Sequence, residues 1–377
     1  MGFLSELRST LQAKRGFDLN MAIGVDGFVD EILHVVDKRL DAENFTRINT
    51  LAELGSRVSR SAGLSTNIEL VTVQTKLGGN GPILSNALIE YGVNLTYFGA
   101  IGYPEIHPVF KPMADKASKV YSLSNPALTD ALEFSDGKLM LGKHKAFREI
   151  TWGRCKEIMG GPAAIAAMID GCHLFGMENW TMIPFMSPIW EGLIAEVFPL
   201  LKTREKKPLA FFDLADPEKH TKGDIRHAMG LIGRFEGKFR AVLGLNEKEL
   251  FQIAEVLDVK IDEHADSGEK FRKAVVDTYN ALGIYCLVVH PVKEAACCIG
   301  GEYFRTDGPY CANPVLTTGA GDNFNAGFCL GISLGLDPLS ALALGVSTSG
   351  FYVRNARSPS FDEVIDFISL WEAGKAD

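Results

Sequence analysis

The second half of the chain alternates short apolar segments with helical segments, and this alternation limits the fold more than any other feature. Nearly continuous apolar strands are typical of a parallel sheet that is buried on both faces, with helices crossing between successive strands. We therefore predict an α/β fold with a mainly parallel sheet, whose ligands bind at the carboxyl ends of the strands. The predicted strands are 172–176, 209–213, 241–245 and 285–290, the predicted helices are 187–201, 223–234, 247–256 and 268–282, and further strands are predicted at 20–25, 68–76 and 95–101.

Two segments are predicted to leave this core. Asp136-Gly137 lies between two alternating runs, which predicts a tight hairpin. A second hairpin is predicted within residues 31–48, where a β-branched run ends in a polar turn and returns. We therefore predict one domain, residues 1–377, with inserted segments at approximately 31–48 and 130–150 that form a small β lid.

The composition excludes several classes of protein. The net charge of −9 leaves no basic surplus to replace phosphate counterions, so we expect no nucleic-acid partner. No apolar run is long enough to span a bilayer, and the amino terminus lacks the apolar region of a signal peptide. We therefore expect a cytoplasmic protein with no membrane partner. The seven cysteines and eight histidines are dispersed, which predicts reduced thiols and no metal cluster built from these residues.

The segment from Thr317 to Gly327 predicts a glycine-rich loop that turns into a buried helix. A helix start offers unpaired N–H groups and a partial positive charge, and both favour a phosphate. Asp322 lies in the same turn, where a carboxylate can take a proton from a substrate hydroxyl. Phe324 stands where a dinucleotide-binding fingerprint needs its third glycine, and the chain has no P-loop motif. The pattern favours phosphoryl transfer, and a plain glycine-rich loop with a capping aspartate is the alternative.

Thr318-Gly319-Ala320-Gly321-Asp322-x-Phe324-x-x-Gly327 resembles the carboxy-terminal signature of the ribokinase-like (PfkB) carbohydrate kinases. The likeness continues over most of the chain in the same order, which implies a ribokinase-like fold. The other matching segments are Gly24 to Asp30, which resembles the opening strand; Gly78-Gly79-Asn80-Gly81, which resembles the Gly-Gly turn beside the sugar; Asp213 to Pro217; and Asn246-Glu247-Lys248-Glu249, which resembles an Asn-x-x-Glu element near the magnesium-bound phosphates.

The resemblance implies a catalytic centre at the carboxy-terminal glycine turn. Asp322 is the expected catalytic base, and the N–H groups of Gly319, Ala320 and Gly321 are the expected anion hole. Such a site fits phosphoryl transfer, which depends on alignment and charge neutralisation more than on covalent chemistry.

Nucleotide and metal contacts are expected at four further residues, of which the resemblance implies Asn246 and Glu249. Asn246 and Glu249 are the expected positions of Mg²⁺ contacts, through water, and a helix N-cap with its capping-box partner is the structural alternative for this pair. Thr318 and Asn355 are further candidates for cofactor binding. ATP is the expected donor, with ADP left open.

The acceptor is expected near the opening strand and the Gly-Gly turn. The resemblance implies that an Asp of the opening strand binds sugar hydroxyls. Asp30 is the preferred ligand and Asp26 the second, and positions i and i+4 of a strand share a face. Gly78, Gly79 and Asn80 are expected to line the same pocket. A solvated turn at Asp26 and Asp30 is the alternative.

The chain also departs from the family pattern. Leu316 stands where the family often has a polar residue that helps bind a monovalent cation, which argues against that cation here. Ile83 lies near the place of a customary asparagine. The usual Thr-x-Gly segment near the nucleotide is replaced by His290-Pro291-Val292-Lys293, so we expect altered donor binding.

We predict nucleotide-dependent phosphorylation of a hydroxyl on a sugar or sugar-like molecule. A nucleoside kinase or an ADP-dependent sugar kinase of the same fold are alternatives, as is a non-catalytic ligand-binding protein on this scaffold. The sequence leaves the acceptor and the oligomeric state open; a homodimer that pairs exposed lid edges is one option.

Overall fold

The larger of two sheets forms the centre of the molecule. The computed structural model describes residues 2–261, 264 and 266–376, and in these residues the larger sheet has nine strands in the order β14-β13-β12-β11-β10-β9-β1-β5-β6. All neighbours from β12 to β6 are parallel, whereas β13 and β14 are antiparallel at one edge. The predicted α/β class and mainly parallel sheet are therefore confirmed. These strands are β1 (Asn20–Val25), β5 (Asn94–Gly99), β6 (Lys119–Ser122), β9 (Leu174–Met177), β10 (Leu209–Asp213), β11 (Arg240–Leu245), β12 (Cys286–Val289), β13 (Glu294–Ile299) and β14 (Glu302–Asp307).

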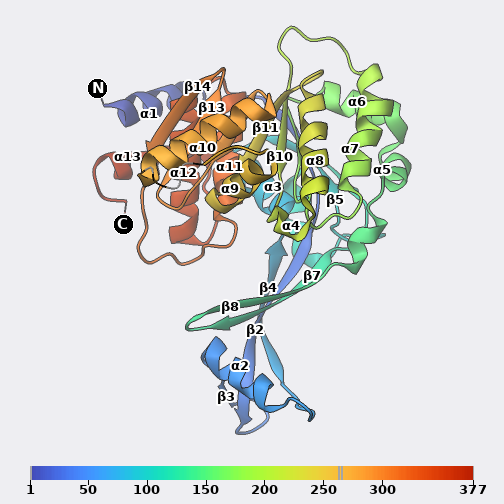
Figure 1. Cartoon of the computed structure of the whole chain (residues 1–377), viewed down its shortest axis with the longest axis vertical. Coiled ribbons are helices and arrows are strands. Elements are labelled where there is room, and N and C mark those ends of the chain that lie inside the picture. The colour runs from blue at the N-terminus through green and yellow to red at the C-terminus, as the bar shows by residue number, and fades with distance from the viewer. Residues whose placement is uncertain (1, 262–263, 265, 377) are drawn as a thin grey trace.

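Helices cover both faces of this sheet (Figure 1). Successive residues of a strand point to opposite faces, so Ala210 and Phe212 of β10 pack with one set of helices and Phe211 with the other. The first set is α5 (Trp152–Met159), α6 (Gly161–Asp170), α7 (Met186–Gly192), α8 (Lys222–Phe235), α9 (Glu247–Val256) and α10 (Ser267–Leu282); the second is α1 (Phe3–Ala13), α3 (Asn80–Glu90), α4 (Lys111–Lys116), α11 (Ala320–Ser333), α12 (Pro338–Asn355) and α13 (Phe361–Glu372).

A small sheet projects from this body as an arm, with α2 (Leu51–Arg60) and β3 (Phe45–Arg47) at its far end (Figure 1). Its central strand is β2 (Phe28–Arg39), which pairs antiparallel with β4 (Leu70–Gly78) and parallel with β7 (Ala127–Phe134). The hairpin predicted at Asp136-Gly137 is present, because β7 turns directly into β8 (Gly137–Lys143). The participation of β4 in this sheet was not predicted from the sequence.

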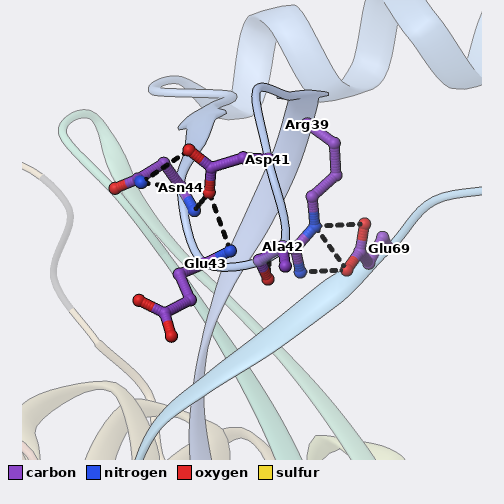
Figure 2. Close-up of polar contacts among 6 residues, drawn as sticks. All are labelled: Arg39, Asp41, Ala42, Glu43, Asn44 and Glu69. Carbon is purple, nitrogen blue, oxygen red and sulfur yellow. Dashed lines mark hydrogen bonds and ion pairs between the residues drawn. The ribbon is translucent and has the colours of Figure 1, made fainter.

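The tip of the arm is held by polar contacts (Figure 2). Between β2 and β3, Oδ1 of Asp41 accepts from the backbone N–H groups of Glu43 at 2.9 Å and Asn44 at 2.7 Å. Arg39 forms an ion pair with Glu69, the residue before β4. Nη1 of Arg39 also donates to the carbonyl of Ala42 at 3.0 Å. The exposed turn is therefore tied to both neighbouring strands.

The helix predicted over 187–201 is wrong in its second half. The α-helix α7 ends at Gly192 and continues as a π turn, Leu193–Val197, and a 3₁₀ turn, Phe198–Leu200. Pro199 has no N–H for an α-helical hydrogen bond, so the regular helix cannot run through it.

Candidate active site

The start of α11 forms the loop-to-helix turn that the sequence predicts. Gly319 has φ of +92°, and a Cβ at this position would lie 2.8 Å from the hydroxyl oxygen of Tyr352. That hydroxyl donates to the carbonyl of Thr318 at 2.8 Å, which fixes the loop against α12. The amide of Ala320 donates to the carbonyl of Thr317 at 3.1 Å. Within the described residues, the amides of Gly319 and Gly321 have no acceptor and are available to an anion.

Asp322 lies in the first turn of α11 and is buried, with 7% of its surface exposed. Its Oδ1 accepts from Nδ2 of Asn80 at 2.9 Å. Burial raises the pKa of Asp322 to about 8, the nearby Asp26 adds to this, and the Asn80 hydrogen bond opposes it. The two glycine turns that the sequence singled out therefore meet at one carboxyl group.

Asp26 is fully buried, and its carboxylate is hydrogen-bonded to backbone amides at the start of α3. Its carboxylate accepts from the amides of Asn80 at 3.0 Å and Gly81 at 2.9 Å, and from Nδ2 of Asn179 at 2.9 Å. Desolvation raises its pKa to about 6 despite these bonds. Asp26 thus positions the turn that carries Asn80, and this geometry favours a structural role over the predicted contact with sugar hydroxyls.

Asp30 lies on β2 between two neighbouring strands of the arm. It is paired in register with Lys76 of β4 and Thr129 of β7, and it is 6% exposed. A Cβ on Gly78 would lie 2.3 Å from Oδ2 of Asp30, so the glycine makes room for this carboxylate. Gly79, with φ of +101°, makes the turn into α3. Burial raises the pKa of Asp30, while Thr129 and Lys76 oppose the shift.

Asn246 and Glu249 form a capping box at the start of α9, so the structural alternative for this pair is present. Oδ1 of Asn246 accepts from the amide of Glu249 at 2.9 Å, and Oε2 of Glu249 accepts from the amide of Asn246 at 2.9 Å. Oε1 of Glu249 accepts from the amide of Asp216 at 2.8 Å. The same carboxylate lines a cavity of about 360 Å³ together with Asp213 and Asp322, so the pair also faces the site.

A second cavity, of about 270 Å³, opens on the other side of the α11 turn. It runs between the segment after β12, the loop after β14 and the buried face of α12. The two cavities share His290 and Gly321 in their linings. Other residues that line the second cavity are Lys293, Tyr310, Cys311, Thr317, Ala320, Phe324 and Val353.

Asn355, a predicted cofactor contact, does not belong to the described linings of these two cavities. It lies at the end of α12, where its Nδ2 donates to the carbonyl of Phe351 at 2.8 Å, and it lines a separate hollow with Glu363 and Asp366.

Sequence reasoning missed Glu178, which follows β9 directly. It is fully buried, and neither of its carboxyl oxygens has a partner in the described residues. Burial raises its pKa well above the ordinary value, and the neighbouring Asp213, Asp322 and Asp26 add to the effect. An acidic residue at the carboxyl end of an apolar strand was the available signal, because ligands bind at that edge of such a sheet.

Comparison with known proteins decides the family. The family model described as "Prokaryotic ketohexokinase" matches residues 7–371. The chain belongs to the prokaryotic ketohexokinase family. A curated relative, the ketohexokinase of Haloferax volcanii, is 28% identical over 348 residues, which cover 92% of this chain and 90% of the relative. This member of the family is therefore a ribokinase-like sugar kinase.

Solved structures agree in fold with this ketohexokinase-family chain. Ribokinase of Arabidopsis thaliana, complexed with ribose and ATP, has a TM-score of 0.63 at 15% identity and covers 93% of this chain and 99% of its own. The nucleoside kinase of Methanocaldococcus jannaschii has a TM-score of 0.60 at 13% identity, and the match covers 94% of this chain and 99% of that kinase.

In the described residues, no helix is long and apolar enough to cross a membrane, and no cluster of three or more His, Cys, Asp or Glu side chains could hold a metal ion.

Proposed function

We propose that this sugar kinase transfers the terminal phosphate of ATP to a hydroxyl of a ketohexose, with Asp322 as the general base. The single observation that carries the proposal is the position of Asp322. It is buried, it is held by Asn80, and it stands in the same turn as the unpaired amides of Gly319 and Gly321. The family and its curated relative favour a ketohexose as acceptor.

In the proposed reaction the side chains mainly position the reactants and accept one proton. Asp322 takes the proton of the acceptor hydroxyl as its oxygen attacks the terminal phosphorus of ATP. The bond between that phosphorus and the oxygen of the leaving ADP breaks. The amides of Gly319 and Gly321 stabilise the negative charge on the migrating phosphoryl group. The amide of Ala320 already donates to Thr317, so it is the weakest of the three predicted donors.

The acceptor is proposed to lie where Asp30 and the Gly78-Gly79-Asn80 turn face Asp322. The nucleoside of ATP fits the cavity of about 270 Å³, which Thr317 and Ala320 line, and Thr318 supports that loop through its carbonyl.

The arm of β2, β4, β7 and β8 is proposed to be a lid that closes over the sugar. Closure would exclude water and limit hydrolysis of the nucleotide.

Magnesium fits this site through water better than by direct contact. Both oxygens of Glu249 already accept backbone N–H groups, and the carboxylate is only 4% exposed. Asn246 and Glu249 would therefore hold a hydrated ion by hydrogen bonds to its water. The ion would neutralise charge on the transferred phosphates.

Three further predictions about this kinase stay proposals. Leu316 offers no side-chain oxygen, so we propose that activity needs no monovalent cation. The exposed apolar residues Leu139, Met140 and Leu141 of β8 support a homodimer that pairs through the arm. We also propose that the protein is located in the cytoplasm.

A donor and acceptor screen tests the function. ATP or ADP, each with Mg²⁺, is incubated with ketohexoses, aldohexoses, ribose and adenosine, and the phosphorylated product is measured. We expect turnover with ATP and a ketohexose. Faster turnover with adenosine would show a nucleoside kinase, a preference for ADP would show the ADP-dependent alternative, and ligand binding with no product would show a non-catalytic protein.

A further inference from the structure

His290 stands at the boundary between the two cavities of the site. It follows β12 directly, and its amide continues the parallel ladder by donating to the carbonyl of Leu245 at 3.0 Å. The side chain therefore emerges at the carboxyl edge of the sheet. Only His290 and Gly321 belong to the described linings of both cavities.

The imidazole ring is held in place by α11. Its centroid lies 5.0 Å from that of the Phe324 ring, with the planes tilted by 40°. A Cβ on Gly321 would lie 2.9 Å from Cε1 of His290, so the ring packs directly on the backbone of the turn. The ring thus lies beside one of the two unpaired amides that are proposed to receive the migrating phosphoryl group.

The ring also has unused hydrogen-bonding capacity. No hydrogen bond joins either ring nitrogen to another described residue. Burial lowers the pKa of His290 to about 4, against an opposing contribution from its own backbone, so the ring is neutral at pH 7. A neutral imidazole carries one N–H donor and one acceptor nitrogen. A polar ring that borders two cavities and bonds no other residue is a candidate for a ligand contact.

We propose that the ring N–H of His290 donates a hydrogen bond to the phosphate chain of the nucleotide, where the chain passes from the cavity of about 270 Å³ to that of Asp322. His290 is then a positioning residue that fixes how far the terminal phosphate reaches toward the acceptor. This inference rests on the proposed function. It assigns a nucleotide contact to the segment His290-Pro291-Val292-Lys293, where the sequence departs from the family pattern.

Binding measurements with two nucleotide probes test the proposal. Calorimetry compares adenosine, which lacks phosphate, with the non-hydrolysable ATP analogue AMP-PNP in the presence of Mg²⁺. His290→Phe keeps a ring against Phe324 but removes the donor, so we expect the Kd of AMP-PNP to rise about 10-fold. The Kd of adenosine is expected to stay unchanged. His290→Gln restores a donor and is expected to recover most of the AMP-PNP affinity, and His227→Phe on the surface is the control.

The outcomes separate the inference from the proposed function. If the wild type phosphorylates a sugar while His290→Phe binds AMP-PNP as tightly as the wild type, the phosphate contact is wrong. Equal weakening of adenosine and AMP-PNP would also overturn it, since that result indicates packing alone. If the wild type binds no nucleotide at all, the proposed function itself fails. Should His290→Phe not fold, His290→Leu makes the same comparison without an aromatic ring.

Discussion

Nδ2 of Asn80 lies 2.9 Å from Oδ1 of Asp322, and this hydrogen bond joins two glycine turns that are 242 residues apart in the chain. The bond fixes the orientation of the proposed base and favours its ionised form, because an N–H donor stabilises a carboxylate. The start of α3 and the start of α11 thus act together on one carboxyl group.

Replacing Asn80 is expected to impair the base without changing the fold. Asn80→Ala should lower kcat/KM about 10-fold at pH 7, since it removes a charge-assisted hydrogen bond. The acid limb of the pH profile should also move to higher pH. Asn94→Ala is a matched control, because Asn94 donates to Asp18 at 2.8 Å away from the site. A profile with an unshifted acid limb would contradict the positioning of Asp322 by Asn80.

The pH dependence of the wild-type enzyme should report the burial of Asp322. A base must be ionised, and the pKa of Asp322 is raised to about 8, so the active fraction of free enzyme increases as pH rises toward that value. We expect kcat/KM to increase from pH 6, to reach half of its plateau near pH 8 and to level off above about pH 9. The measurement is initial rate against pH at low acceptor concentration. A constant kcat/KM from pH 6 to pH 9 would contradict this assignment.

Asp26 and Asp30 should behave differently when each is replaced by alanine. Asp26→Ala leaves three N–H donors, two of them buried and one partly buried, without an acceptor, so the free energy of unfolding should fall by about 3 kcal/mol or more. Asp30→Ala should leave the thermal midpoint nearly unchanged while the KM for the acceptor rises about 10-fold. Thermal unfolding and acceptor kinetics on both variants make the comparison. A stable Asp26→Ala protein with a raised acceptor KM would reverse the two roles.

Glu178 is expected to cost stability at neutral pH. Its pKa in the folded state lies well above its ordinary value, so the folded protein binds a proton that the unfolded chain releases. Its contribution to stability is therefore full at low pH and falls as pH rises above about 4.5. Glu178→Gln removes that loss, so the variant should gain on the wild type in thermal midpoint between pH 5 and pH 8. The buried acids shared by both proteins cancel in the difference. A constant difference across that range would show that Glu178 does not titrate on unfolding.

The sequence predicts those parts of the fold and site that depend on local pattern. The apolar strands β9 to β12, the hairpin at Asp136-Gly137 and the turn before α11 each follow from neighbouring residues. The membership of β4 in the small sheet does not, because its alternating pattern says that one face is solvated but not which strand it pairs with. The β13–β14 hairpin was missed although Gly300-Gly301 marks its turn, since a pair of glycines is a common loop signal.

Site residues divide in the same way. The place of Asp322 in the first turn of α11 and the capping box of Asn246 and Glu249 follow from local sequence. The occupation of Asp26 by Asn80 and Gly81 depends on a contact across 54 and 55 residues, and only the folded chain brings these groups together. Glu178 is buried by tertiary packing, so its sequence position could not reveal its unpaired carboxyl group.

The turnover of Asp322→Asn tests the proposed mechanism most directly. Asparagine keeps the size of the side chain and can still pair with Asn80, but it cannot accept the proton of the sugar hydroxyl. With Mg²⁺, ATP and a ketohexose that the wild type phosphorylates, we predict a kcat lower by about 10²–10⁴-fold and binding of both substrates within a few-fold of the wild type. A kcat near that of the wild type, at unchanged binding, would contradict the assignment of Asp322 as the general base.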